Sequence, residues 1–417
     1  MRVEDKSYLK SIATLVSGSV IAQAFTVVCA PILTRLYSPE ALGVYSLVTG
    51  AVTMFGAIMS LRYEMCIVSE PSEKKIYPLI KVSFFTCCIL SIIISVGYCI
   101  YFGEIGFSTT ALVLGIITGI LVFLMGIINI VTSYNNRYKD YTLITKTYVK
   151  RVISQNICNI IAGFLSFGSI GLSVSQVIGY TAGVYGQAKP LLKHKSEVLD
   201  STKTEVQEVL VENIKQVSFA TPAALANGLS YSLISYFIQA LFNTAIVGYY
   251  SMSFRILGLP ISLISTNVSK VFLEKASREY EMKGNFKHTY LGTLGASTII
   301  SIPLGLVLAL LAPVACEFFF GSGWGVAGNY IRILTPMFML RFIAGCVSSA
   351  AIIVKKQQID FWIQLLATIF TIVVFIMAKR FSFGIDDYLA LLNIGFCIIY
   401  ILYIFLFWIC AKNDTKK

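Results

Sequence analysis

The chain alternates between long apolar runs and short polar segments along its whole length. Each run is near the ~20 residues that a helix needs to cross a bilayer at ~1.5 Å per residue. The pattern predicts about twelve spanning helices, at 11–34, 41–66, 79–102, 109–132, 145–167, 170–189, 214–241, 245–271, 289–313, 328–354, 359–379 and 386–410. In hydrocarbon, continuous runs satisfy their backbone groups only as helices, because strands would need short alternating segments. The prediction is an all-α polytopic membrane protein.

Composition agrees with this pattern. Over half of the 417 residues are hydrophobic and only 13% are charged, against roughly 25% in a typical soluble domain. The net charge of +12 does not indicate nucleic-acid binding, because the basic residues form no patch on a soluble domain. They gather instead at alternate ends of the predicted helices.

The distribution of basic residues predicts the orientation. If the N-terminus is cytoplasmic, the outer loops hold only Arg35, Lys379 and Arg380 of the 33 lysines and arginines, and nearly all others fall in inner segments. Positive charge favours the cytoplasmic side, so we expect both termini inside.

A short repeat suggests two similar halves. Residues 42–46 (LGVYS) and 247–251 (VGYYS) each follow a span and a tight outer turn, and they open the second and the eighth predicted spans. Two six-helix halves with the same order of inside and outside imply a parallel, pseudo-symmetric repeat. We therefore expect an N-terminal lobe at 1–190, a polar cytoplasmic linker at 191–213 and a C-terminal lobe at 214–417.

Enzymatic, metal and redox chemistry find little support in the sequence. The ten cysteines lie in or beside apolar runs without a CxxC pair, and the two histidines lie in polar segments. No nucleophile–base pair, phosphate-binding loop or carboxylate dyad is present. We expect no cofactor, no metal and no enzyme activity.

Several motifs resemble a known family. Residues 34–45 (TRLYSPEALGVY) are similar to the signature after the first helix of Wzx-type O-antigen flippases, which belong to the multidrug/oligosaccharidyl-lipid/polysaccharide (MOP) superfamily. Residues 62–64 (RYE) resemble the family's basic-aromatic-acidic pattern. Residues 247–250 (VGYY) and 255–260 (RILGLP) resemble the second-half counterpart.

The resemblance implies a MATE-like, V-shaped bundle of two six-helix lobes around a central cavity. It implies that a polyprenyl-diphosphate-linked oligosaccharide, such as an O-antigen unit of lipopolysaccharide, moves from the cytoplasmic to the outer leaflet by alternating access. An H⁺ or Na⁺ gradient would drive transport in the bacterial inner membrane. A polysaccharide polymerase and a chain-length regulator are the expected protein partners.

Arginines within predicted helices are the candidate substrate ligands. A charge in hydrocarbon costs at least about 2.5 kcal/mol, so each is expected to meet a polar neighbour or water. Arg255 and Arg341 lie near mid-membrane by helical rise, Arg332 lies near the outer end of its span, and Arg62 near the inner end. Together they are the predicted anion site for the diphosphate, because a guanidinium offers a planar fork to phosphate oxygens. Structural packing and snorkelling remain open for each.

Other polar residues suggest secondary roles. Glu64 is either a candidate for ion coupling or an interfacial carboxylate paired with a loop lysine. Arg62 should lie on a nearly opposite helix face and so not pair with it. Arg35, in the first outer turn, either caps the helix, pairs with Glu40 or acts at a gate.

Amides and one aromatic residue are candidate sugar contacts. Gln23 and Asn227 fall near mid-membrane in equivalent spans, and Tyr231 follows Asn227 by one turn. Interhelical hydrogen bonding explains them equally well.

Two other functions remain open. A multidrug or small-cation antiporter of the same superfamily would favour intramembrane carboxylates over arginines. A membrane glycosyltransferase or polymerase would need a larger outer loop than the widest gap here, about 314–327.

Overall fold

The computed structural model describes residues 3–107, 109–354 and 356–412, and these are helical with short connections. No strand occurs among these residues. Nine helical segments in this part of the chain are long and apolar enough to cross a membrane. The chain is therefore an all-α, multi-pass membrane protein, as predicted from its apolar runs.

The chain forms two compact units, Met1–Ser232 and Leu233–Lys417. The boundary lies inside one long helix, α9. The helices that build the first unit are α1 (Val3–Leu36), α2 (Pro39–Phe55), α3 (Tyr63–Ser69), α4 (Glu73–Glu104), α5 (Ala111–Arg137), α6 (Tyr141–Phe164), α7 (Gly168–Leu192), α8 (Lys195–Asp200) and most of α9 (Lys203–Leu241).

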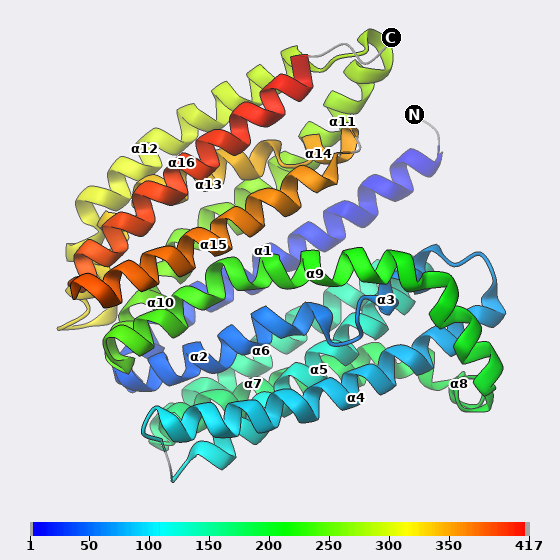
Figure 1. Cartoon of the computed structure of the whole chain (residues 1–417), viewed down its shortest axis with the longest axis horizontal. Coiled ribbons are helices and arrows are strands. Elements are labelled where there is room, and N and C mark those ends of the chain that lie inside the picture. The colour runs from blue at the N-terminus through cyan, green and yellow to red at the C-terminus, as the bar shows by residue number, and fades with distance from the viewer. Residues whose placement is uncertain (1–2, 108, 355, 413–417) are drawn as a thin grey trace. The chain divides into compact units, whose positions relative to one another are not determined.

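The first unit is built around α5 (Figure 1). This helix packs against α4 on one side and α7 on another, while α6 packs on α7 and α1 on α6. Close approach of α4 and α5 depends on Gly115, where an added Cβ atom would lie 2.5 Å from the backbone nitrogen of Cys99. Small residues let membrane helices approach closely, so dispersion contacts hold this pair.

The second unit contains the end of α9 and a further set of helices. These are α10 (Thr244–Pro260), α11 (Thr266–Lys283), α12 (Lys287–Phe320), α13 (Gly325–Val347), α14 (Ala350–Ile353), α15 (Gln357–Phe381) and α16 (Ile385–Lys412). The buried helix α13 is the centre, and α10, α12 and α16 pack against it.

The three predicted spans outside the nine apolar segments correspond to α6, α7 and α9. They are present as helices of 24, 25 and 39 residues. α6 carries three basic residues, Lys146, Lys150 and Arg151, which lowers its apolar character. The residues 191–213, expected as a polar linker, comprise the last residues of α7, the short helix α8 and the first part of α9.

The prediction of one continuous helix over 41–66 is wrong. This segment is interrupted after Phe55 by a 3₁₀ turn, Gly56–Ile58, and by a tight turn that precedes α3. Leu61 and Arg62 both have positive φ, 49° and 66°, which is unusual for residues other than glycine. A backbone in this conformation cannot continue a right-handed helix.

Candidate functional site

The break after α2 creates a buried ion pair at the end of the first unit's second span. Glu64 is 2% exposed, and its carboxylate accepts a hydrogen bond from the Ser60 hydroxyl. The Arg62 guanidinium lies 3.6 Å from the same carboxylate. The expectation that these two side chains could not pair is wrong, because it assumed an unbroken helix.

Side chains from other helices satisfy the carbonyls that the break releases. Asn129 of α5 donates to the Gly56 carbonyl at 2.9 Å, and Thr221 of α9 donates to the Leu61 carbonyl at 2.8 Å. At the other end of α3, Arg137 of α5 donates to the carbonyls of Ile67 and Glu70. Unpaired backbone groups are costly away from water, so these contacts stabilise a conformation that the local sequence does not favour.

In the second unit, Arg341 contacts aromatic rings. Its guanidinium carbon lies 5.6 Å from the ring centres of Phe254, on α10, and Phe338, one turn earlier on α13. The side chain is half-buried. Cation–π contacts of this kind stabilise a charge in apolar surroundings.

Arg255 and Arg332 are exposed. Arg255 follows Phe254 on α10, and Arg332 lies on α13 with Arg341. Among the described residues, no ion pair joins either arginine to a carboxylate. The second unit therefore brings Arg341 against the helix that carries Arg255, while the predicted fourth member, Arg62, belongs to the first unit.

The remaining predicted residues lie on α1 and α9. Gln23 is half-buried on α1, and Arg35 is exposed in the last turn of this helix. On α9, Asn227 is exposed and Tyr231 is half-buried. No ion pair joins Arg35 to Glu40 in the described part of the chain.

Sequence reasoning missed Arg151. This residue lines a pocket of about 280 Å³ inside the first unit, and its guanidinium carbon lies 5.0 Å from the rings of both Tyr148 and Tyr180. Thr132 and Gln187, joined by a 2.8 Å hydrogen bond, add polar groups to the lining. The distribution of basic residues places Arg151 in an inner segment, although this residue lies inside the predicted span 145–167. Its position inside a span was the feature of the sequence that could have identified it as a candidate site residue.

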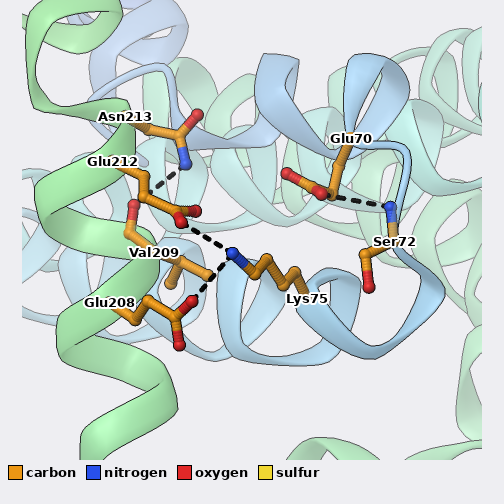
Figure 2. A network of polar contacts seen from close by, with 7 residues as sticks. All are labelled: Glu70, Ser72, Lys75, Glu208, Val209, Glu212 and Asn213. Carbon is orange, nitrogen blue, oxygen red and sulfur yellow. Dashed lines mark hydrogen bonds and ion pairs between the residues drawn. The ribbon is translucent and has the colours of Figure 1, made fainter.

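Another polar cluster connects α4 to the start of α9 (Figure 2). The Lys75 ammonium lies 2.8 Å from Glu208 and 2.6 Å from Glu212. Nearby, Lys81 donates to the carbonyls of Leu199 and Ser201 at 2.8 Å each. The residues predicted as a linker are thus fastened to the first unit by charge-assisted contacts.

Metal-binding geometry does not occur in the described residues. No group of three or more His, Cys, Asp or Glu side chains is arranged to hold an ion, and the ten cysteines are free.

Comparison with solved structures reveals the same fold in transporters. An inward-facing multidrug resistance MATE family transporter of the MOP superfamily aligns with a TM-score of 0.75 at 13% identity, covering 95% of this chain and 94% of that one. The lipid II flippase MurJ, in an inward closed conformation, aligns with a TM-score of 0.73 at 16% identity, covering 95% and 87%. A MOP superfamily transporter from Pyrococcus furiosus aligns with a TM-score of 0.62 at 15% identity, covering 98% of this chain and 97% of that one.

At these identities the likeness establishes the fold. A sequence search of curated proteins finds no match. A family model described as "Polysaccharide biosynthesis protein" matches residues 32–329, which is well over half of the chain. The chain therefore belongs to the polysaccharide biosynthesis protein family, with the fold of MOP superfamily transporters.

Proposed function

We propose that this protein is a flippase that moves a polyprenyl-diphosphate-linked oligosaccharide from the cytoplasmic to the outer leaflet by alternating access. The family connects the chain to polysaccharide biosynthesis, and the fold is shared with MurJ, a lipid II flippase. The observation that carries the proposal is the set of arginines on apolar helices whose guanidinium groups remain reachable.

The diphosphate is the part of this substrate that arginines recognise. Arg255 and Arg341 form the main anion site in our proposal, with Arg332 and Arg62 as further ligands. The exposure of Arg255 supports this assignment, because its guanidinium can reach phosphate oxygens, and Arg341 places a second positive charge on the helix that packs against α10. We add Arg151, whose pocket offers the same chemistry in the first unit.

Polar residues of the first unit have further roles in the proposal. Gln23, Asn227 and Tyr231 contact the sugar, since amide and aromatic groups suit sugar hydroxyls and ring faces, and Arg35 acts at the outer gate. Glu64 couples transport to H⁺ or Na⁺. Its burial and its pairing with Arg62 support a role in which ion binding competes with the ion pair.

The cellular setting follows from the same proposal. The protein lies in the bacterial inner membrane with both termini in the cytoplasm, in keeping with the distribution of basic residues. Its lobes comprise residues 1–190 and 214–417, joined by 191–213. It supplies O-antigen or a similar repeat unit to a polysaccharide polymerase that works with a chain-length regulator.

A reconstituted flipping assay tests the proposal. Proteoliposomes containing a fluorescent polyprenyl-diphosphate oligosaccharide are treated with a membrane-impermeant quencher, and the protected fraction is followed over time. The Arg255→Ala and Arg341→Ala variants are expected to slow flipping at least tenfold, while Arg278→Ala, an exposed residue paired with Glu274 at 2.9 Å, serves as the control. Flipping at the wild-type rate in both variants would remove the proposed anion site.

The same preparation separates the two remaining functions. Efflux of a cationic dye without lipid flipping would identify a multidrug or small-cation antiporter, as the MATE likeness also permits. Formation of a new glycosidic product would identify a glycosyltransferase. Neither activity is expected.

A further inference from the structure

A second pocket lies in the second unit, apart from the proposed substrate arginines. It has a volume of about 380 Å³ and is bounded by α11, α12 and α13. The polar residues of its lining are Lys275, His288, Thr289, Thr293 and Ser297. Phe342 and Cys346, which are completely buried in α13, add apolar lining. The pocket therefore combines basic and hydroxyl groups with an apolar wall.

The polar side chains of the lining remain able to bind a ligand. Lys275 and His288 are exposed, and the side chains of these two residues and of Thr293 have no hydrogen bond or ion pair within the described part of the chain. The nearby carboxylate of Glu279 is already engaged, since it accepts the Thr289 amide at 2.8 Å and lies 3.7 Å from Lys283. Lys275 supplies a full positive charge, and the imidazole and hydroxyl groups supply donors.

An apolar surface continues from the pocket along α12. Ile300, which lines the pocket, is 46% exposed, and Ile299, Leu306 and Leu310 beyond it are more exposed still. Such a surface does not stabilise a water-soluble anion, whereas a lipid acyl chain packs against it. Basic pockets between membrane helices at the cytoplasmic side are known sites for anionic lipid headgroups.

We propose that this pocket, which lies on the cytoplasmic side in the predicted orientation, binds an anionic phospholipid of that leaflet. The lipid phosphate contacts Lys275, His288 and the Thr293 hydroxyl, and one acyl chain lies on the exposed apolar side of α12. None of the arginines proposed to bind the diphosphate lines this pocket, and its occupation does not require the protein to flip a lipid-linked sugar.

Two glycines of α12 provide a matched pair of variants. Gly292 lines the pocket, whereas Gly295 does not, and a Cβ atom added at either would meet no atom of another helix within 4 Å. Gly292→Leu should therefore fill the pocket without disturbing the helix packing, and Gly295→Leu should leave it open. Both replacements favour the helix. Lys275→Gln removes the charge, and Lys287→Gln, at an exposed lysine outside the pocket, is its control.

Native mass spectrometry of the full chain in detergent measures the binding. The wild type is titrated with phosphatidylglycerol, with phosphatidylcholine of the same acyl chains, and with inorganic phosphate. We expect preferential binding of phosphatidylglycerol, weakened about fivefold by Lys275→Gln, because one lysine near an anionic lipid surface contributes about that factor. Gly292→Leu should abolish the preference, and both control variants should retain it.

Three results would overturn the proposal. Equal binding of the two lipids would exclude headgroup recognition. Unchanged phosphatidylglycerol binding in both Lys275→Gln and Gly292→Leu would place the lipid elsewhere. Displacement of the lipid by millimolar inorganic phosphate would assign the pocket to a free anion. Melting temperatures of the variants identify any that fail to fold. If Gly292→Leu fails to fold, phosphatidylglycerol binding by Lys275→Gln alone tests the proposal.

Discussion

The two helices that carry the internal repeat begin alike and end differently. α2 and α10 are both 17 residues long. The Ser38 side chain caps α2 by accepting the backbone N–H of Ala41, and the Asn243 side chain caps α10 by accepting the backbone N–H of Ile246. After α2 the helix is interrupted by a 3₁₀ turn and by the left-handed turn at Leu61 and Arg62. After α10 a π-helical turn, Ile261–Ser265, leads directly into α11.

The arginines in these two regions have different surroundings. In the first unit, the left-handed turn after α2 brings Arg62 to the buried Glu64. In the second unit, Arg255 lies within α10, before the π-helical turn, and its side chain is exposed. One unit therefore pairs its arginine with a buried carboxylate, and the other leaves its arginine exposed. Four predictions test this comparison, beginning with the largest expected effect.

Glu64→Ala should give the largest loss of stability. Removing one partner of a buried pair costs about 3–5 kcal/mol, and we expect about 2 kcal/mol because the Arg62 side chain is 26% exposed. The loss is measured as the free energy of unfolding in mixed micelles. The double variant Arg62→Ala/Glu64→Ala should lose less than the two single variants combined, and strict additivity would contradict a coupled pair.

Removing the helix caps should affect both units equally. Ser38→Ala and Asn243→Ala are each expected to cost about 1 kcal/mol, since each leaves one amide of the first helical turn without its acceptor. Ser38→Asp and Asn243→Asp keep the acceptor and serve as controls in the same unfolding measurement. A large cost in one unit alone would show that the two helices do not begin in equivalent ways.

Glycine should have different effects at the break after α2 and at the π-helical turn after α10. Leu61 has a φ of 49°, which glycine adopts without strain, so Leu61→Gly should be no less stable than the parent. Ile261 has a φ of −66°, so Ile261→Gly should cost about 1 kcal/mol. Thermal unfolding in detergent measures both. A clear loss at Leu61 would mean that its side-chain packing outweighs the backbone strain.

Lys75→Met should have the smallest effect. The contacts of this lysine with Glu208 and Glu212 are partly exposed, so the melting temperature should fall slightly at low salt and match the parent at 1 M NaCl (Figure 2). Lys74→Met, at the exposed neighbour, is the control. A large loss that persists in high salt would indicate a structural role beyond screened charge attraction.

The sequence predicted most of the helices because apolar runs of sufficient length have one solution in a bilayer. It also located the repeat and the arginines that lie in apolar surroundings. The break at Leu61 and Arg62 was missed, because neither residue is a glycine and nothing nearby signals a left-handed backbone. The contacts that stabilise it come from Asn129 and Thr221, far away in the chain.

Arg151 was missed for a related reason. A linear count placed it with the lysines at the inner end of its span, whereas packing of α6 against α7 places its guanidinium beside Tyr180. A charged side chain reaches an aromatic ring or a pocket through residues of other helices. The linear sequence does not show which helices lie next to one another.

The sequence alone determined that the chain crosses the membrane repeatedly as helices, because backbone groups must be satisfied within each apolar run. The tertiary structure decided where a helix breaks and which charged groups meet. Those outcomes depend on hydrogen bonds and ring contacts between segments far apart in the chain, and a local pattern carries no record of them.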